Sequence, residues 1–452
     1  MEQSEKKRRL LIIAVALGFI LNPLNTTMIS VAFSRLQDDF GLSFADISWL
    51  ISTYYLASAI GQPVLGKLSD MFGRKRMFIL GLLLVTASSM LAPLSPGFHW
   101  LLAFRFVQAI GTSAVFPSGM SMIRSVVTEN QARALGILSV FSSTSAAFGP
   151  SIGGFLIHYG DWPAIFLINF PVILVSLILA VKVMPADTQQ PVNMKIDSWG
   201  IVQFSLLVLV WLLFLLSVSS GGQWWLLGAG MALGYLFYRF ELRQPQPFID
   251  VHFLKSNPHV TLIYIQNILV NIVFYSVTFG IPMYLQTARH FDTQETGLSM
   301  LFLSGFAVLI TPLAARWLDA KGSRYPLFIG TLTVILGMLL LMTVQDGSGL
   351  TWFFVALSFL GMSTGLNNLG LQTALYSFVS MEETGIASGL LMTSRYIGTI
   401  FSSSLLGNVF GTEIASKELH AMALICAVIG GLMLILTVRL HRVKREAPSF
   451  FR

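Results

Sequence analysis

The strongest constraint in this sequence is a series of fourteen apolar segments, each long enough to cross a lipid bilayer as a helix. A helix rises about 1.5 Å per residue and the hydrocarbon core of a bilayer is about 30 Å thick, so one span needs roughly 20 mainly apolar residues. Fourteen spans in 452 residues leave almost no chain for soluble domains. We therefore predict an all-α polytopic membrane protein. The predicted spans are 10–33, 44–65, 77–95, 100–123, 135–157, 164–184, 199–218, 223–240, 259–284, 296–316, 325–344, 350–379, 385–410 and 421–440.

Lysine and arginine residues indicate the orientation of these spans, because positively charged loops stay in the cytoplasm. If the N-terminus is cytoplasmic, 23 of the 28 Lys and Arg residues fall on the cytoplasmic side and three fall outside. The other two, Arg105 and Arg395, lie within spans. We expect both termini in the cytoplasm, in a multi-pass protein of the plasma (inner) membrane.

The sequence also contains an internal repeat, which is visible in the loops that follow the second and tenth spans. Asp70 and Asp319 are 249 residues apart, and so are the starts of the first and ninth spans, at residues 10 and 259. Six spans with their loops need roughly 180 to 200 residues, so this spacing leaves room for two additional helices. The recurring set is Gly66, Asp70, Gly73 and Arg74, repeated in degenerate form as Ala315, Asp319, Gly322 and Arg324.

The repeat predicts two six-helix bundles with two additional central helices between them. The bundles are 1–184 and 259–440; the linker 185–258 carries the additional transmembrane helices 199–218 and 223–240; and 441–452 form a cytoplasmic tail. Two bundles that run in the same direction are typical of secondary transporters, whose binding site lies between the halves near the bilayer midplane. A channel or a polytopic enzyme has no need of this duplication.

The sequence gives no indication of enzymatic chemistry. Cys426 is the single cysteine, and no Cys/His spacing suggests a zinc site. Residues 361–365 fit the nucleophile pattern G-x-S-x-G, but they lie within an apolar span, which favours helix packing by small residues. No phosphate loop or nucleotide fingerprint appears. Long uncharged stretches disperse the net charge of +7, which excludes a nucleic-acid partner. We predict a protein that is not an enzyme and has no cofactor and no metal.

Four stretches carry a resemblance to a known family. They are GKLSDMFGRKR at 66–76, RFVQAIG at 105–111, GPSIGG at 149–154 and LNTTMISVAF at 24–33. Together they resemble the major facilitator superfamily, and specifically its 14-span drug:proton antiporter family. The resemblance covers most of the chain, and it implies that family's fold of two six-helix bundles plus two central helices.

The resemblance also implies roles for two of these stretches. In the family, the loop at 66–76 latches the cytoplasmic side shut while the cavity faces outward; the alternative is an ordinary basic inner loop. The stretch at 149–154 is similar to the antiporter motif G-P-x-x-G-G, which implies a kinked fifth span and antiport rather than symport. The implied latch residues are Gly66, Asp70, Gly73, Arg74, Asp319 and Arg324, and the implied kink residues are Gly149, Pro150, Gly153 and Gly154.

The sequence leaves the group that would couple transport to protons open. Asn25 stands where the family's span-one pattern has an acid, and none of the 21 acids falls at mid-span. Coupling through a carboxylate requires a buried acid in the translocation path. The candidates are Arg105, inside the fourth span, and Asp46 and Asp161, near outer ends of spans. The alternative for Arg105 is a side chain that reaches out to the membrane surface.

Polar residues at three- and four-residue spacing predict a cavity. Arg395 lies near mid-depth with no acid of its own helix in reach, so it must be satisfied by carbonyls, amides, water or an anionic ligand. This charge favours neutral or anionic substrates, although Arg395 as a structural residue is an equal alternative. Any single polar residue could simply join helices. The predicted cavity residues are Asn22, Asn25, Thr26, Tyr264, Asn267, Asn271, Tyr275, Thr364, Asn368, Gln372 and Arg395.

We therefore expect a monomeric secondary transporter in the lipid bilayer that exports small amphiphilic, drug-like compounds by alternating access, in exchange for protons. The expected partners are the small-molecule substrate and protons. The alternatives are a solute uptake carrier and a non-transporting sensor built on the same fold.

Overall fold

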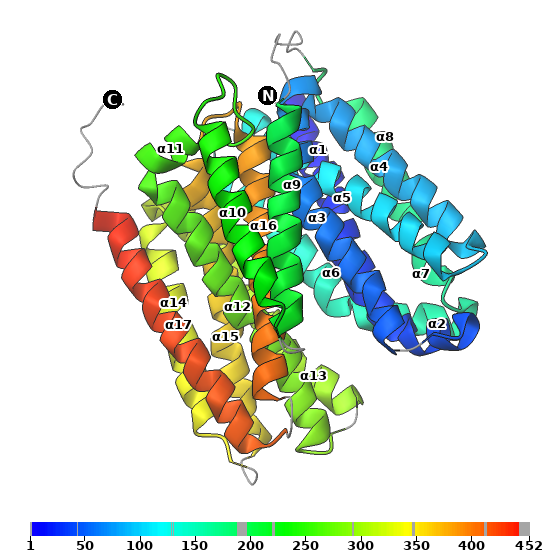
Figure 1. Ribbon diagram of the computed structural model, residues 1–452, viewed down its shortest axis with the longest axis vertical. Helices are drawn as coiled ribbons and strands as arrows, with labels where there is room; N and C mark the ends of the chain where they lie inside the picture. Colours follow the sequence, from blue (N-terminus) through cyan, green and yellow to red (C-terminus); the bar gives the residue numbers. More distant parts are fainter. Residues whose placement is uncertain are drawn as a thin grey trace. The chain divides into compact units, whose positions relative to one another are not determined.

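The computed structural model describes residues 2–42, 44–127, 129, 131–187, 197–218, 222–291, 293–345, 349–410 and 414–442. Within these ranges every regular element is a helix and no strand occurs (Figure 1). Helices suit such apolar sequence because each backbone N–H and C=O pairs within its own segment. The α-helices are α1 (Glu2–Met28), α2 (Phe33–Phe40), α3 (Phe44–Phe72), α4 (Arg74–Leu91), α5 (Phe98–Val126), α6 (Gln131–Gly160), α7 (Ala164–Leu167), α8 (Asn169–Val183), α9 (Ser198–Val218), α10 (Trp224–Glu241), α11 (Val251–Ser256), α12 (Pro258–Thr287), α13 (Thr293–Lys321), α14 (Arg324–Met342), α15 (Leu350–Tyr376), α16 (Thr384–Val409) and α17 (Ser416–Arg442).

A helix, or the helix pair α7 and α8, occupies most of each of the fourteen predicted spans. Ten candidate spans in the described part of the chain are both long and apolar enough to cross a membrane. The helices α3, α6, α10 and α16 are not among these ten. The described part of the chain therefore has ten helices that could cross a membrane, which supports a multi-pass architecture. The full count of fourteen spans and the cytoplasmic position of both termini stay predictions.

The chain forms two compact units, which we call unit 1 and unit 2. Unit 1 comprises Met1–Ser205 and Val379–Thr393, and unit 2 comprises Leu206–Phe378 and Ser394–Arg452. The first part of α16 thus packs with the N-terminal helices, although the sequence places it in the second half of the repeat. The predicted bundle boundaries did not include this exchange.

In unit 1, α1 and α5 each pack against several other helices. Helix α5 packs against α3 and α4, α1 packs against α6 and α8, and α1 and α5 also contact each other. Glycine allows the closest of these approaches: a Cβ on Gly81 would lie 2.6 Å from the carbonyl oxygen of Gly111, and a Cβ on Gly111 would lie 2.8 Å from that of Gly81. Small residues let helix backbones approach to this distance, where dispersion contacts hold them together in lipid.

Unit 2 repeats the pairing of unit 1. Its α15 packs against α13 and α14, as α5 does against α3 and α4. A Cβ on Gly365 would lie 2.8 Å from the carbonyl oxygen of Ala307 on α13. Gly73 and Gly322, which correspond in the sequence repeat, both have a positive φ, of 110° and 73°. The internal repeat is thus visible in the packing of each unit and in its loop geometry.

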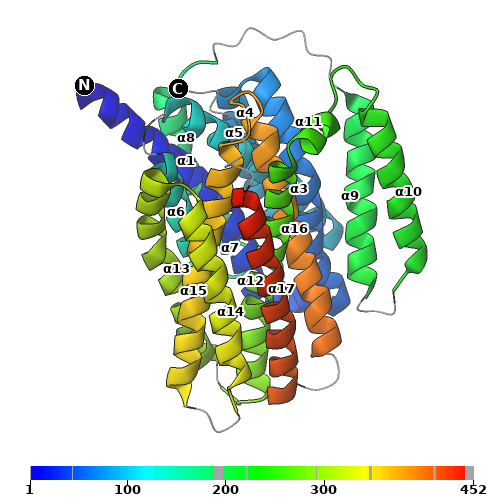
Figure 2. The same cartoon turned by 90° about the vertical axis from the view of Figure 1, so that its left-hand side faces the viewer.

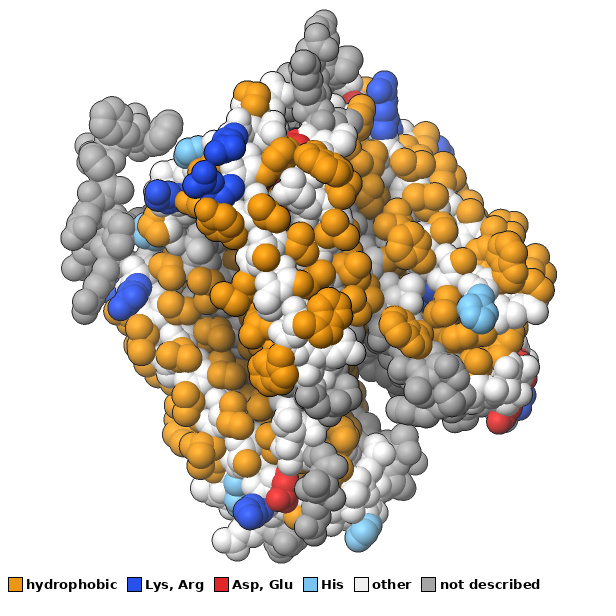
Figure 3. Space-filling view, in the orientation of Figure 1, with side chains coloured by type: hydrophobic (Ala, Val, Ile, Leu, Met, Phe, Trp, Pro, Cys, Tyr) orange, Lys and Arg blue, Asp and Glu red, His pale blue; other side chains and the backbone are white. Residues whose placement is uncertain are grey.

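Exposed side chains along the helices are largely apolar, as expected for contact with lipid. On α10, for example, Trp225, Met231 and Tyr235 are each more than 60% exposed, and hydrophobic side chains extend along this helix in Figure 3. Helices α9 and α10 lie side by side (Figures 1 and 2). The indole ring of Trp211 on α9 packs against Gly230 on α10. A Cβ added to Gly230 would lie 3.2 Å from this ring.

Candidate functional site

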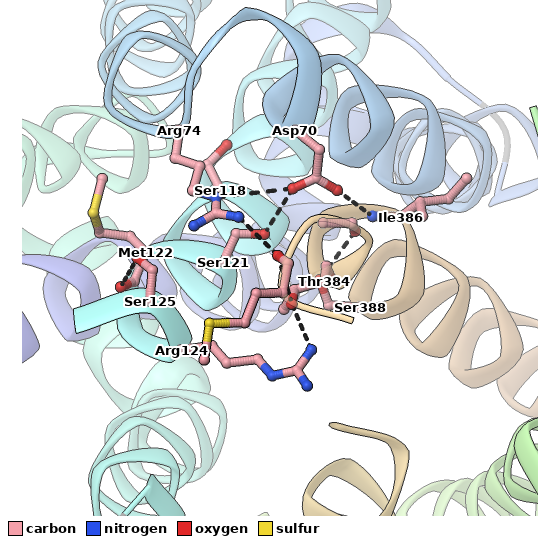
Figure 4. A network of polar contacts seen from close by, with 12 residues as sticks. Asp70, Arg74, Ser118, Ser121, Met122, Arg124, Ser125, Thr384, Ile386 and Ser388 are labelled. Atoms are coloured by element: carbon pink, nitrogen blue, oxygen red, sulfur yellow. Dashed lines mark hydrogen bonds and ion pairs between the residues drawn. The ribbon is translucent and has the colours of Figure 1, made fainter. Parts of the chain in front are cut away.

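A buried carboxylate in unit 1 joins three helices. We call Asp70, Arg74, Ser121, Arg124, Thr384 and Ile386 the Asp70 cluster (Figure 4). Asp70 accepts hydrogen bonds from the Ser121 hydroxyl on α5 and from the backbone N–H of Ile386 on α16, both at 3.2 Å. Its side chain is 8% exposed and lies 3.9 Å from the guanidinium of Arg74. Because Ile386 is in the first turn of α16, the carboxylate also faces the positive end of that helix dipole.

Arg124 supplies the opposite charge in the cluster. Its Nη1 donates to the carbonyl oxygen of Ser380 at 2.7 Å and to the hydroxyl of Thr384 at 2.6 Å, and its Nη2 donates to the carbonyl of Val379. Arg74 donates to a fourth acceptor in this segment, the carbonyl of Met381, at 2.7 Å. The guanidinium groups of Arg74 and Arg124 therefore donate hydrogen bonds to backbone carbonyls in the turn between α15 and α16. These carbonyls lie outside the regular hydrogen bonding of the two helices.

Glycine residues bring the backbones together beside the Asp70 cluster. An added Cβ on Gly66 would overlap the carbonyl oxygen of Gly385 and lie 2.6 Å from its carbonyl carbon. An added Cβ on Gly389 would lie 2.5 Å from the carbonyl oxygen of Gln62. Since the opposing atoms are backbone, no rotamer change could relieve either overlap. The contact between α3 and the start of α16 thus depends on glycine on both sides.

Burial changes the acidity of Asp70, which follows the apolar part of α3 and lies in the charged segment 66–76, outside the predicted span 44–65. Burial raises the pKa of Asp70 to about 7, against the lowering effect of Arg74. Because this pKa exceeds the ordinary value of 3.8, protonation stabilises the packed state: the stabilisation is complete below 3.8 and is lost as the pH rises through about 7.

Asp187, which the sequence did not single out, holds the loop in place. Its carboxylate accepts from the backbone N–H groups of Lys75 at 3.0 Å and Arg76 at 3.1 Å, and so caps the start of α4. An added Cβ on Gly73 would lie 2.9 Å from the Cβ of Asp187. Gly73 therefore serves two purposes: it adopts φ 110° and it leaves room for this cap.

We expect Asp187→Asn to weaken this cap, destabilising the protein by about 1 kcal/mol, and to reduce the transport that the sequence predicts, because the start of α4 positions Arg74. Thermal unfolding and flux in vesicles measure the two effects. The matched control is Asp197→Asn, since Asp197 accepts from Gly200 N–H at 2.8 Å at the start of α9. The control should lose similar stability and keep its flux; equal flux in the two variants would contradict the positioning role.

Arg105 lies in a second polar group of unit 1, where it is 1% exposed. Its Nη1 donates to the Gln108 side-chain oxygen at 2.6 Å and to the Asn25 carbonyl at 3.3 Å. Asn25 and Asn169 exchange side-chain hydrogen bonds at 3.0 Å, and Gln108 donates to Ser89 at 3.2 Å. We call Asn25, Ser89, Arg105, Gln108 and Asn169 the Arg105 network. The side chain does not reach the surface, so the alternative of an Arg105 extended to the membrane surface does not hold in this structure.

In unit 2, four of the predicted cavity residues come together on α12 and α16. Asn267 donates to the Ser394 hydroxyl at 2.7 Å, and Asn271 donates to the Asn267 carbonyl at 2.7 Å. Arg395 donates to the Tyr275 hydroxyl at 3.1 Å, with its guanidinium 5.8 Å from the centre of that ring. Arg395 is part-buried, and the acceptor of its Nε–H is the phenol oxygen of Tyr275.

The other predicted cavity residues are more scattered. Thr26 and Thr364 donate to carbonyls of their own helices, and Gln372 is buried. On α15 the fully buried amide is Asn367, which donates to Ser363, whereas the predicted Asn368 is only half-buried. Asn22 and Tyr264 are also half-buried.

The remaining predicted residues fall at helix ends or contacts. Asp161 pairs with Arg35 at 3.2 Å in an exposed ion pair, and the side chain of Asp46 lies outside the described residues. Asp319 and Arg324 are exposed, unlike Asp70 and Arg74 in the other unit. In the G-P-x-x-G-G stretch, an added Cβ on Gly149 would lie 2.9 Å from the Cβ of Thr27, Gly153 is buried and Gly154 faces open space. The side chain of Pro150 lies outside the described residues.

Comparison with known proteins agrees with this architecture. The family model of the Major Facilitator Superfamily matches residues 15–403. An uncharacterized MFS-type transporter, YwoD, from Bacillus subtilis is 42% identical, covering 98% of this chain and 99% of that protein. The tetracenomycin C resistance and export protein of Streptomyces glaucescens is 26% identical over 89% of this chain and 76% of that one. Other relatives are named a multidrug resistance protein, a multidrug transporter protein and a riboflavin transporter.

A solved structure shares the fold. The human organic anion transporter MFSD10 has a TM-score of 0.69 and 16% sequence identity, covering 96% of this chain and 99% of that one. At this identity the similarity concerns the fold alone.

Proposed function

Because the chain belongs to the Major Facilitator Superfamily and is a transporter, we propose that it exports small amphiphilic compounds across the plasma (inner) membrane, as a monomer and in exchange for protons. We propose further that it is a member of the 14-span drug:proton antiporter family. Export is supported by relatives whose names describe antibiotic export and multidrug transport. The alternatives are an uptake carrier, favoured by the relative named a riboflavin transporter, and a sensor that does not transport.

The observation that carries this proposal is the Asp70 cluster. Its contacts join helix ends through charge-assisted hydrogen bonds and close backbone packing. Such a contact can form and break as a unit, as alternating access requires. We therefore propose that it is the cytoplasmic gate, with Gly66, Asp70, Gly73 and Arg74 as its latch residues.

For substrate selection, we propose that Asn267, Asn271, Tyr275 and Arg395 form part of the cavity. Arg395 gives this group a positive charge, and the groups hydrogen-bonded within it are amides, hydroxyls and carbonyls. A positive charge that is partly shielded from water disfavours cationic substrates. The proposed substrates are therefore neutral or anionic. For coupling, Arg105 is the first residue to test, followed by Asp46 and Asp161.

The test is transport in reconstituted vesicles with an imposed proton gradient, using a lipophilic cation, a neutral amphiphile and an organic anion. We expect Arg395→Gln to reduce anion flux at least about tenfold while leaving neutral flux nearly unchanged, since only the anion gains from the charge. Lys417→Gln removes the same charge from an exposed position in unit 2 and serves as the control.

Three outcomes of this experiment would decide between the alternatives. Robust exchange of the lipophilic cation would contradict the proposed substrate class. Movement of substrate in the same direction as protons would indicate uptake. Substrate-induced stabilisation of the protein without flux would indicate a sensor.

A further inference from the structure

The guanidinium of Arg105 uses only part of its hydrogen-bonding capacity. Both described hydrogen bonds leave from Nη1. Neither Nε nor Nη2 has an acceptor among the side chains and backbone atoms that the structure describes. These two atoms form one edge of the guanidinium, the edge that binds a carboxylate through two parallel hydrogen bonds. Arg105 thus presents a complete anion-binding edge while it is 1% exposed.

The surroundings of Arg105 carry no compensating charge in the described part of unit 1. The network partners Asn25, Gln108 and Asn169 are neutral amides. The ring of Tyr54 lies 4.6 Å from the guanidinium carbon, and its hydroxyl pairs with Thr112 at 2.8 Å. A ring face attracts a cation but supplies no lone pair to the Nε–Nη2 edge. A buried cation held only by neutral groups is costly, and a nearby negative charge removes most of that cost.

From this geometry we infer that Arg105 is a binding site for a small monovalent anion, held through its Nε–Nη2 edge. The chemistry fits either a free inorganic anion such as chloride or the carboxylate of an organic anion. In either case the bound anion performs the task of an acidic side chain. This inference goes beyond the proposed transport function and does not depend on it, because it concerns binding by the resting protein.

Asn25 offers a direct test, because its side chain lies inside the network. Its Oδ1 accepts from Gln108 at 3.1 Å and from Asn169 at 3.0 Å, and its backbone carbonyl receives Nη1 of Arg105. Asn25→Asp would place a carboxylate in the network at nearly unchanged volume. This built-in charge should replace the bound anion and make added anions unnecessary.

The experiment measures thermal unfolding of the purified full-length protein in detergent. Sodium chloride and sodium benzoate are titrated against sodium lactobionate, whose anion is too large to enter a helix bundle, at constant ionic strength. We expect chloride or benzoate to raise the midpoint in a saturable manner by about 3 °C or more. Stabilisation by chloride would identify a free inorganic anion, and stabilisation by benzoate alone would identify an organic carboxylate.

Variants then locate the effect. Asn25→Asp and Arg105→Gln should both lose the anion dependence, whereas Asn25→Ala, which removes the amide without adding charge, should keep it. Should one of the first two variants fail to fold, the other decides. No saturable stabilisation of the unaltered protein would overturn the inference, because neutral groups or water would then suffice. Equal stabilisation of Asn25→Asp and the unaltered protein would overturn it too, because the anion would then bind elsewhere.

Discussion

Replacing Gly66 with alanine is expected to reduce transport by about 5- to 150-fold, because it forces apart the backbones that meet beside the Asp70 cluster. The added methyl group would overlap the Gly385 carbonyl, and backbone atoms cannot turn aside. Overpacking of this kind costs about 1–3 kcal/mol, which corresponds to roughly a 5- to 150-fold loss in the population of the packed contact.

The packed contact can be followed directly with a single cysteine. Cys426 is the only cysteine, so a Cys426→Ala background permits Ser388→Cys, at a fully buried position of α16, as a reporter. In Gly66→Ala, the rate at which this cysteine reacts with a maleimide should rise by about 5- to 150-fold, in proportion to the open population.

Gly305→Ala is the matched control, because nothing lies within 4 Å of an added Cβ at that position. The control should change neither the labelling rate nor the flux. If Gly66→Ala labels and transports as the control does, the close approach of α3 and α16 is not part of the transport cycle.

Much of the fold can be predicted from the sequence, because the length of each apolar segment determines which residues can form a membrane-spanning helix. The spacing of 249 residues between Asp70 and Asp319 anticipates the shared pairing of α5 and α15 with their neighbours. The sequence predicts a loop at 66–76, and Gly73 in this segment has a positive φ of 110°. The turn at Gly73 is encoded locally, whereas the repeat is found by comparing two segments that lie 249 residues apart.

The partners of the Asp70 cluster were not predictable in this way. Arg124 reads in the sequence as one of many basic residues at the end of a span, yet it binds acceptors about 255 residues further along the chain. Asp187 follows α8 and caps α4, more than 100 residues earlier. Such contacts depend on how helices pack, and neither residue has a periodic pattern that would reveal its partner.

The surroundings of the two arginines within the spans were also not predictable from the local sequence. Arg105 and Arg395 both stand out in the sequence as arginines within spans. In the structure they differ: Arg105 is fully buried among amides, while Arg395 is part-buried against Tyr275. Depth along a helix can be counted from the sequence, but the direction of a side chain and the number of its acceptors cannot.

Replacing Arg124 with alanine is expected to have the second large effect, a loss of transport of about 100-fold. The substitution leaves the carbonyls of Val379 and Ser380 and the hydroxyl of Thr384 without this donor. Hydrogen bonds to a charged group contribute about 1.5–3 kcal/mol each, so losing even two costs about 3 kcal/mol, equivalent to roughly a 100-fold change in the population of the packed contact.

Flux in vesicles and labelling of Ser388→Cys measure the outcome, with Arg76→Ala as the control, since Arg76 is an exposed arginine in the first turn of the nearby α4. Arg124→Lys separates charge from geometry: it keeps the positive charge, but a single ammonium cannot reproduce the reach of two guanidinium nitrogens. We expect its flux to lie between those of Arg124→Ala and the unaltered protein. Flux in Arg124→Lys equal to that of the unaltered protein would mean that the segment 379–384 responds to the charge of Arg124 alone. The same flux in Arg124→Ala as in Arg76→Ala would mean that these contacts are not needed for transport.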